Sequence, residues 1–83
     1  MYFVYILKLN HPVKRLYIGS TPDIKRRMRQ HMSGQVEFTK SKLPVELFYI
    51  EGYNNRNLAL IREKNLKKSG STYVGLLKRL GLK

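Results

Sequence analysis

Of the five acidic residues in this 83-residue chain, Glu63 has the position best suited to chemistry. Helical spacing places it beside Ala59 and Leu66. A carboxylate at such an apolar boundary costs free energy unless it is ion-paired or metal-bound. Carboxylates are also the ligands of the divalent metals that assist phosphodiester hydrolysis. Two interpretations stay open, a metal ligand or an ordinary salt bridge to Arg62, Lys67 or an arginine of the preceding helix.

The other four acidic residues have simpler interpretations. Asp23 stands where negative charge suits the start of a helix. Glu37 falls in a polar segment that we expect to be a loop. Glu46 and Glu51 fit polar positions of a half-exposed strand. None of these four predicts a site.

A second group of reactive side chains lies in the stretch LYIGSTPDIKRRMRQHM, residues 16–32. The stretch is typical of a short strand followed by a helix. Arg27 and His31 are four positions apart and therefore project from the same side of that helix. A strand end and a helix edge thus bring Tyr17, Arg27 and His31 toward a common place, where a phenol, a guanidinium and an imidazole would meet.

The strongest compositional feature is charge. Seventeen Lys and Arg against five Asp and Glu give a net charge of +12. Such an excess favours a polyanionic partner, of which nucleic acid is the commonest, although solubility alone is the alternative. The lack of cysteine excludes disulfides, thiolate metal sites and a cysteine nucleophile. Two histidines are too few for a multi-histidine zinc site.

The hydrophobic pattern predicts one cytoplasmic domain over residues 1–83, with no membrane segment and no signal peptide. We expect an α+β (α/β) fold, a small three-stranded antiparallel sheet flanked by helices in the order β-β-α-β-α-α. Residues 2–9, YFVYILKL, are nearly all apolar and predict the central strand. A hairpin joins them to a strand at 16–20, and a third strand is expected at 45–52.

The first helix is expected to begin with Thr21 as N-cap and Pro22 at its first position, and to end at Gly34. Residues 34–42 should form an exposed loop. The predicted apolar stripe of the helix is Ile24, Met28 and Met32.

The second helix is expected to begin at Asn54 or Asn55 and to stop at Gly70. A last helix is predicted over residues 73–80. The apolar residues assigned to the second helix are Leu58, Ala59, Ile61 and Leu66.

In combination, these residues resemble the GIY-YIG nuclease family. Residues 17–19 read Tyr-Ile-Gly and keep the second half of the signature intact. Residues 3–5 read Phe-Val-Tyr, which keeps the tyrosine and replaces the leading glycine. The chain is most similar to small stand-alone bacterial members, which resemble the nuclease subunit of structure-specific endonucleases. The further positions that match the family pattern are Arg27, His31 and Glu63.

The resemblance implies a divalent-metal-dependent endonuclease that hydrolyses DNA phosphodiester bonds, on branched or damaged DNA in repair or recombination. Glu63 would bind one Mg²⁺ or Mn²⁺ ion. Tyr5 or Tyr17 would take the proton from the attacking water, and the sequence does not distinguish them. Arg27 would stabilise the charge developing on the phosphate, and His31 would orient the tyrosine or shuttle a proton.

The same resemblance makes Gly19 a structural residue that lets the backbone pass close to the tyrosines. Exposed cations would contact DNA phosphates without reading bases, and a protein partner would supply substrate specificity. These predicted DNA-binding residues are Lys25, Arg26, Arg29, Lys40, Lys42, Lys64, Lys67 and Lys68.

Two departures from the family pattern keep alternatives open. Phe3 replaces the first glycine, and residues 75–78 lack the asparagine often found a dozen or so positions beyond the glutamate. The alternatives are a catalytically weak nucleic-acid-binding module that acts with a partner, and a small basic RNA-associated protein.

Overall fold

The computed structural model describes residues 1–68, 75 and 77–81 of the chain. The predicted stop at Gly70 lies outside these residues, as does most of the predicted helix over 73–80, of which 75 and 77–79 are helical. Within the described part, no helix is long and apolar enough to cross a membrane. The elements are β1 (Tyr2–Lys8), β2 (Leu16–Thr21), α1 (Ile24–Met32), the 3₁₀ turn η1 (Lys40–Lys42), β3 (Glu46–Tyr53) and α2 (Arg56–Lys68).

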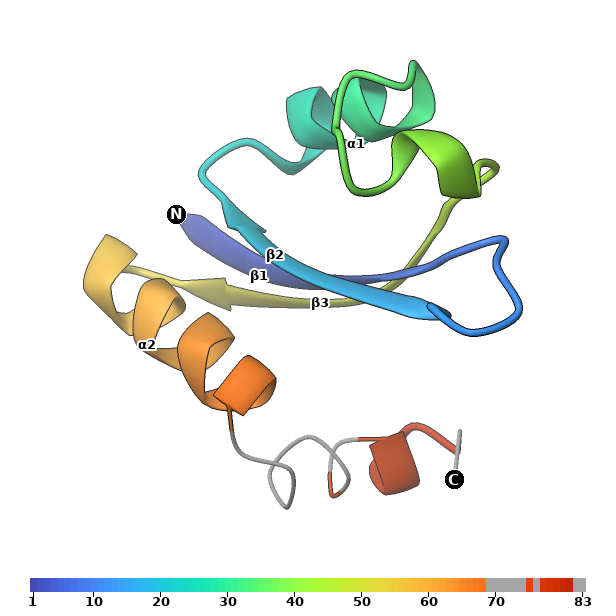
Figure 1. The fold of residues 1–83 in the computed structure, drawn as a ribbon. Helices are drawn as coiled ribbons and strands as arrows, with labels where there is room; N and C mark the ends of the chain where they lie inside the picture. Colours follow the sequence, from blue (N-terminus) through green and yellow to red (C-terminus); the bar gives the residue numbers. More distant parts are fainter. Residues whose placement is uncertain (69–74, 76, 82–83) are drawn as a thin grey trace.

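The three strands form one antiparallel sheet in the order β2-β1-β3. This confirms the predicted α+β fold and the central place of β1. Its residues Val4–Leu7 are fully buried, because helices cover both faces of the strand. Figure 1 shows α1 over one face of the sheet and α2 against the opposite face.

Alternation along β1 divides the core between those two faces. Tyr5 and Leu7 pack toward α1, against Ile24 and Met28 among others. The intervening side chains pack toward α2, where Ala59 and Leu66 are buried. The buried centre of β1 therefore contributes side chains to both halves of the core.

The start of α1 differs from the prediction. Thr21 still belongs to β2, where it pairs with Phe3, and the helix begins only at Ile24. Asp23 is the N-cap instead, and its Oδ1 accepts a hydrogen bond from the Arg26 N–H at 3.0 Å. Pro22 consequently precedes the helix. At the other end, Gly34 has φ +78, which confirms it as the residue that ends the helix.

Two predicted apolar faces are wrong in part. Met32 is exposed, and the buried residue in this last turn of α1 is its neighbour His31, which packs on sheet tyrosines. Leu58 and Ile61 also face solvent, because α2 contacts the sheet through a narrower stripe than expected. The start of α2 agrees with one of the two expected caps, as Asn55 Oδ1 accepts from the Asn57 N–H at 2.7 Å.

The segment after α1 is not the fully exposed loop that its composition predicted. Thr39 is completely buried within it. The following three residues form η1, with the Lys42 N–H donating to the Thr39 carbonyl at 2.9 Å. Although the segment is polar, the Thr39 side chain packs into the interior.

Glu51 was expected at a half-exposed polar position, but the structure places it in a clamp between β3 and α2. Arg62 donates to both carboxylate oxygens, at 2.9 and 3.0 Å. The hydroxyls of Tyr53 and Tyr49 donate to the same two oxygens, at 2.6 and 2.7 Å. Although burial acts to raise it, these donors lower the pKa of Glu51 to about 2. The cluster fastens α2 to the sheet.

Replacing this carboxylate should destabilise the fold in a pH-dependent way. Glu51→Gln leaves Arg62 without its anionic partner and should lower the free energy of unfolding by about 2–3 kcal/mol at pH 7. Because the folded pKa is about 2 and the usual value 4.5, this stabilisation is complete above about pH 4.5 and lost as the pH falls toward 2. Urea unfolding at pH 7 and pH 3 measures it.

Glu46→Gln is the control, since Glu46 is an exposed residue at the start of the same strand. A difference between wild type and Glu51→Gln as large at pH 3 as at pH 7 would contradict this assignment.

Candidate nucleic-acid-cleaving site

The two halves of the tyrosine signature lie on neighbouring strands. Tyr5 of β1 is opposite Gly19 of β2 in the antiparallel register. A methyl carbon built at Gly19 would lie 2.6 Å from the Tyr5 hydroxyl oxygen and 2.7 Å from Cζ. The phenol therefore lies directly on the glycine. Phe3, the departure from the signature, is half-buried and keeps regular pairing with both neighbouring strands.

The Tyr5 hydroxyl connects β1 to α1. Its oxygen lies 2.9 Å from His31 Nε2 and accepts a hydrogen bond from Arg27 Nε at 3.3 Å. Arg27 Nη1 donates to Gln30 Oε1 at 3.0 Å, which fixes the guanidinium plane. Burial raises the pKa of Tyr5, and the hydrogen bond to Tyr5 raises the pKa of Arg27. Burial and then the charge of Arg27 lower the pKa of His31 to about 4, so the imidazole is neutral at pH 7.

Tyr17 completes this group of side chains and differs from Tyr5 in exposure. It is half-buried, whereas Tyr5 is fully buried. Its ring meets the His31 ring edge-on at 5.1 Å and the Phe38 ring at 5.6 Å. It also contributes to the raised pKa of Arg27. The structure thus brings together four of the five predicted site residues on the α1 side of the sheet.

Glu63 approaches from the opposite face. Ser20 of β2 donates its hydroxyl to Glu63 Oε1 at 2.6 Å, and Lys67 Nζ lies 2.8 Å from Oε2. The side chain is 19% exposed. Because β2 is an edge strand, a group beneath the sheet can meet groups above it around that edge. Of the two interpretations left open for Glu63, the salt bridge to Lys67 is observed.

Three adjoining hollows run around the end of β2 from Glu63 to Arg27. The first, of about 460 Å³, is lined by Glu63, Leu60 and lysines of α2. The second shares Leu60 with the first, and shares Ser20, Thr21 and Pro22 with the third. The third extends to Arg26, Arg27 and Gln30. The three hollows therefore form a row, here called the track, with Glu63 at one end and Arg27 at the other.

The predicted DNA-binding cations divide into two groups around this track. Those lining it are Lys64, Lys67, Lys68 and Arg26. Lys40 instead pairs with Glu37 at 3.0 Å. Lys42 lies 4.3 Å from the centre of the Phe38 ring and donates to the Phe38 carbonyl. Lys25 and Arg29 are exposed on α1 and line none of these three hollows.

Glu63 could serve as a single carboxylate ligand of a divalent metal ion. Mg²⁺ in proteins is commonly held by one or two carboxylates, with waters and substrate phosphates as its other ligands. No cluster of three or more His, Cys, Asp or Glu occurs in the described residues that would form a complete protein-lined metal site. Lys67, whose side chain is 51% exposed, can leave the carboxylate when a cation or a phosphate arrives. The residues present fit a shared protein–substrate metal site.

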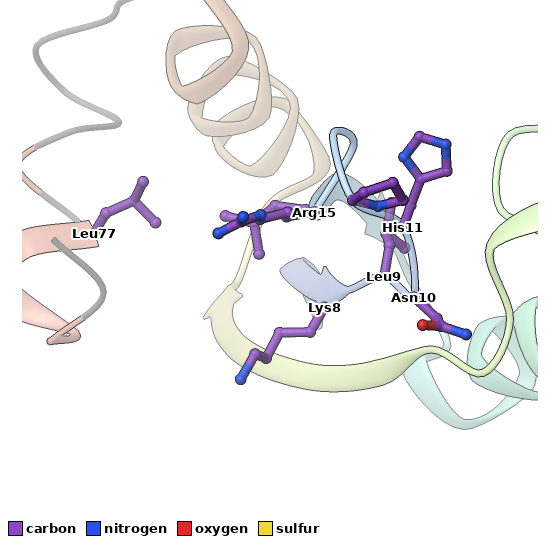
Figure 2. A pocket seen from close by; sticks show the side chains of 8 residues that line it. Lys8, Leu9, Asn10, His11, Arg15 and Leu77 are labelled. Carbon is purple, nitrogen blue, oxygen red and sulfur yellow. The ribbon is translucent and has the colours of Figure 1, made fainter.

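A further hollow lies elsewhere, at the β1–β2 hairpin (Figure 2). It measures about 800 Å³, and Lys8, Arg15 and Leu77 are among its lining residues. In Figure 2, the Arg15 side chain extends toward Leu77. His11 orders the hairpin loop, because its Nδ1 accepts from the N–H groups of Val13 and Lys14. This hollow adds nothing to the tyrosine site.

A search of family models identifies residues 1–76 as a GIY-YIG catalytic domain. The chain belongs to the GIY-YIG family. This is a nuclease domain family, so membership implies a nucleic acid substrate. The resemblance derived from the tyrosine signature is thereby confirmed.

Similar proteins include small members and one much larger protein. A UPF0213 protein of Haloquadratum walsbyi is 36% identical over 67 residues, which cover 80% of this chain and 73% of that protein. The UvrABC system protein C of Mycoplasmoides gallisepticum is 42% identical over 72 residues, which cover 83% of this chain but 12% of that protein. The solution NMR structure of the UPF0213 protein BH0048 from Bacillus halodurans matches with a TM-score of 0.56 at 27% identity, covering 94% and 84% of the two chains.

Sequence reasoning missed two residues that touch the predicted site. One is Ser20, whose hydrogen bond to Glu63 depends on packing between residues 43 positions apart in the sequence. Thr39 lies 2.9 Å from His31 through its Oγ1. The only local signal for Thr39 was a hydroxyl residue in a polar loop, which is too common to identify it.

The close contact over Gly19 gives a direct test. Gly19→Ala should destabilise the fold by about 1–3 kcal/mol, because the added methyl overlaps a fully buried phenol. Displacement of Tyr5 should also break its hydrogen bond to His31. Urea unfolding and the NMR resonances of the His31 ring report these two effects.

Gly75→Ala provides the matched control, since no described residue lies within 4 Å of a methyl at that helical position. It should leave stability unchanged or raise it by up to about 1 kcal/mol. Equal effects of the two substitutions would refute the close packing at Gly19.

Proposed function

We propose that this protein is a divalent-metal-dependent endonuclease that hydrolyses DNA phosphodiester bonds. The observation that carries the proposal is the row of neighbouring hollows around the end of β2, which has the Glu63 carboxylate at one end and the Arg27 guanidinium at the other. A phosphodiester lying in it would meet a metal-binding group at one end and a cation at the other. Similarity to the UvrABC system protein C supports a role in DNA repair, and the proposed substrate is branched or damaged DNA.

In this mechanism, Arg27 stabilises the charge that develops on the phosphate. Tyr5 and Gln30 hold its guanidinium plane before the substrate arrives. Such preorganised donors are effective because little rearrangement is needed in the transition state. Positive charge along the track, from Lys64 and Lys68 in particular, draws the DNA backbone to the same place.

We assign proton transfer from the attacking water to Tyr17 rather than Tyr5. Tyr5 is fully buried, and its hydroxyl is already engaged by His31 and Arg27. Tyr17 is half-buried and lies beside Arg27, so part of its side chain stays accessible to a water molecule near the guanidinium. Burial and hydrogen bonding therefore give the two tyrosines different tasks, with Tyr5 holding the site together.

Glu63 is the proposed ligand of one Mg²⁺ or Mn²⁺ ion. When bound, such an ion neutralises charge on a phosphoryl oxygen and promotes ionisation of a bound water. Ser20 would keep the carboxylate oriented toward the track through its hydrogen bond to Oε1. Lys67 would exchange its contact with Oε2 for one with the DNA backbone.

The alternative is a nucleic-acid-binding module that relies on a protein partner for activity or for substrate choice. Both oxygens of Glu63 are occupied in this structure, by Ser20 and Lys67. The described residues of the 75–78 segment also supply no asparagine. Cleavage and binding must therefore be measured separately.

Cleavage of labelled duplex, single-stranded, flap and four-way-junction DNA in Mg²⁺ or Mn²⁺ tests the proposed reaction. Wild type should cut at least one substrate, and EDTA should stop it. Arg27→Ala should lower the rate by about 100-fold or more, the scale seen when a donor to transition-state charge is removed. Glu63→Gln should abolish metal-dependent cleavage while DNA binding persists.

Glu46→Gln, which removes an exposed carboxylate elsewhere on the molecule, should cut like wild type. If wild type and all variants bind DNA alike and none cuts, the binding-module alternative replaces the nuclease.

Salt dependence of DNA binding separates the cations of the track from those elsewhere. Each phosphate contact should contribute about −0.9 to the slope of log K against log salt concentration. Lys64→Gln should make the slope less steep by about one, because Lys64 lines the track. Lys14→Gln, on the exposed hairpin, should leave the slope unchanged. Fluorescence anisotropy over a NaCl series measures both, and equal slopes for the two variants would argue against the track as the DNA path.

A further inference from the structure

Thr39 is a buried hydroxyl residue with no assigned part in the site. It comes from the segment between α1 and β3, and none of its surface is exposed. Its Oγ1 lies 2.9 Å from His31 Nδ1 and 3.5 Å from the Val36 carbonyl oxygen, to which it donates. A buried hydroxyl with two partners is normally constrained in the direction of its hydrogen bonds.

The direction of the Thr39 hydrogen bonds follows from Arg27, at the other end of a chain of hydrogen bonds that runs through Tyr5 and His31. Arg27 Nε–H can only donate, so the Tyr5 oxygen accepts from it. The Tyr5 hydrogen then points to His31 Nε2, which lies 2.9 Å away and must be unprotonated. A neutral imidazole carries its one hydrogen on the other nitrogen, so Nδ1–H donates to Thr39 Oγ1. Every donor in the chain from Arg27 to Val36 thereby has one acceptor.

The opposite tautomer does not fit these contacts. With hydrogen on His31 Nε2, the Tyr5 oxygen would accept from both His31 and Arg27. The Tyr5 hydroxyl hydrogen would then be buried without either of these partners, which is unfavourable. The His31 imidazole is neutral because burial and the charge of Arg27 lower the pKa of His31 to about 4.

We propose that Thr39 is a positioning residue of the cleavage site: by accepting the Nδ1–H of His31, it directs the Tyr5 hydroxyl away from Arg27 and keeps the Tyr5 oxygen free to accept from the guanidinium. The inference rests on the proposed nuclease function. Thr39 also holds the His31 ring edge-on to Tyr17, at 5.1 Å between ring centres. The Thr39 hydroxyl, although outside the track, thus fixes the orientation of the Tyr5 hydroxyl and of the His31 ring.

The tautomer can be measured without any cleavage. A long-range ¹H–¹⁵N correlation spectrum at pH 8, where an ordinary imidazole is neutral, identifies the protonated nitrogen of each histidine. His31 should carry hydrogen on Nδ1. His11 is an internal reference with the opposite pattern, because its Nδ1 accepts two backbone hydrogen bonds. Hydrogen on Nε2 of His31 in the wild type would overturn the proposal.

Thr39→Val removes the acceptor at nearly constant volume, and Thr39→Ser restores it. Thr39→Val should lower the population of the His31 tautomer that carries hydrogen on Nδ1. It should also lower kcat for DNA cleavage by about 10-fold or more, which is the scale of losing a supporting hydrogen bond at a metal site. KM should not change, since Thr39 is buried and lines none of the three hollows of the track. Thr39→Ser should recover both the tautomer and kcat.

An unchanged tautomer in a folded Thr39→Val protein would overturn the proposal, and so would a shifted tautomer with unchanged kcat. If Thr39→Val does not fold, Thr39→Ser and the wild-type spectrum still decide the hydrogen-bond direction. A wild type that cuts none of the DNA substrates refutes the nuclease itself, and the wild-type His31 spectrum then tests the hydrogen-bond chain independently.

Discussion

The buried hydroxyl of Tyr5 is the constraint on which the site depends. A phenol in the interior must find partners for its oxygen and its hydrogen, and α1 supplies both through Arg27 and His31. The strand residue opposite must then lack a side chain, which is why Gly19 is there. A requirement for satisfying one polar group therefore couples the two signature strands to the first helix.

The order of the strands allows Glu63 and Arg27, which lie on opposite faces of the sheet, to approach the same edge. If β2 were central, the two faces of the sheet would be separated by further strands, and Glu63 could not approach the groups around Arg27. As an edge strand, β2 ends in a short polar rim at Ser20 and Thr21, which both faces share. The clamp at Glu51 and Arg62 holds α2 against the sheet one residue before Glu63. Fold stability and site geometry thus come from adjacent positions of α2.

The sequence predicted what depends on local pattern. The central strand followed from an unbroken apolar run, and Arg27 and His31 from their four-residue spacing. Contacts between distant elements were beyond it, such as Ser20 with Glu63, or Glu51 with its four donors. Thr21 was a reasonable N-cap by residue type, but sheet pairing overrode that preference and left the cap to Asp23. Met32 fitted the helical period, yet the last turn of α1 buries His31 against the sheet and leaves Met32 exposed.

The narrow space above Gly19 also bears on how the hairpin aligns while the chain folds. Sliding β2 by one residue against β1 would place Ile18 or Ser20 opposite Tyr5 and turn Tyr17 to the other face of the sheet. Either side chain would occupy the volume that the phenol needs, so Tyr5 could not be buried against its partners on α1. Misaligned hairpins are therefore penalised by the same contact that builds the site. Burial of Tyr5 against α1 is therefore compatible only with the native register of β1 and β2.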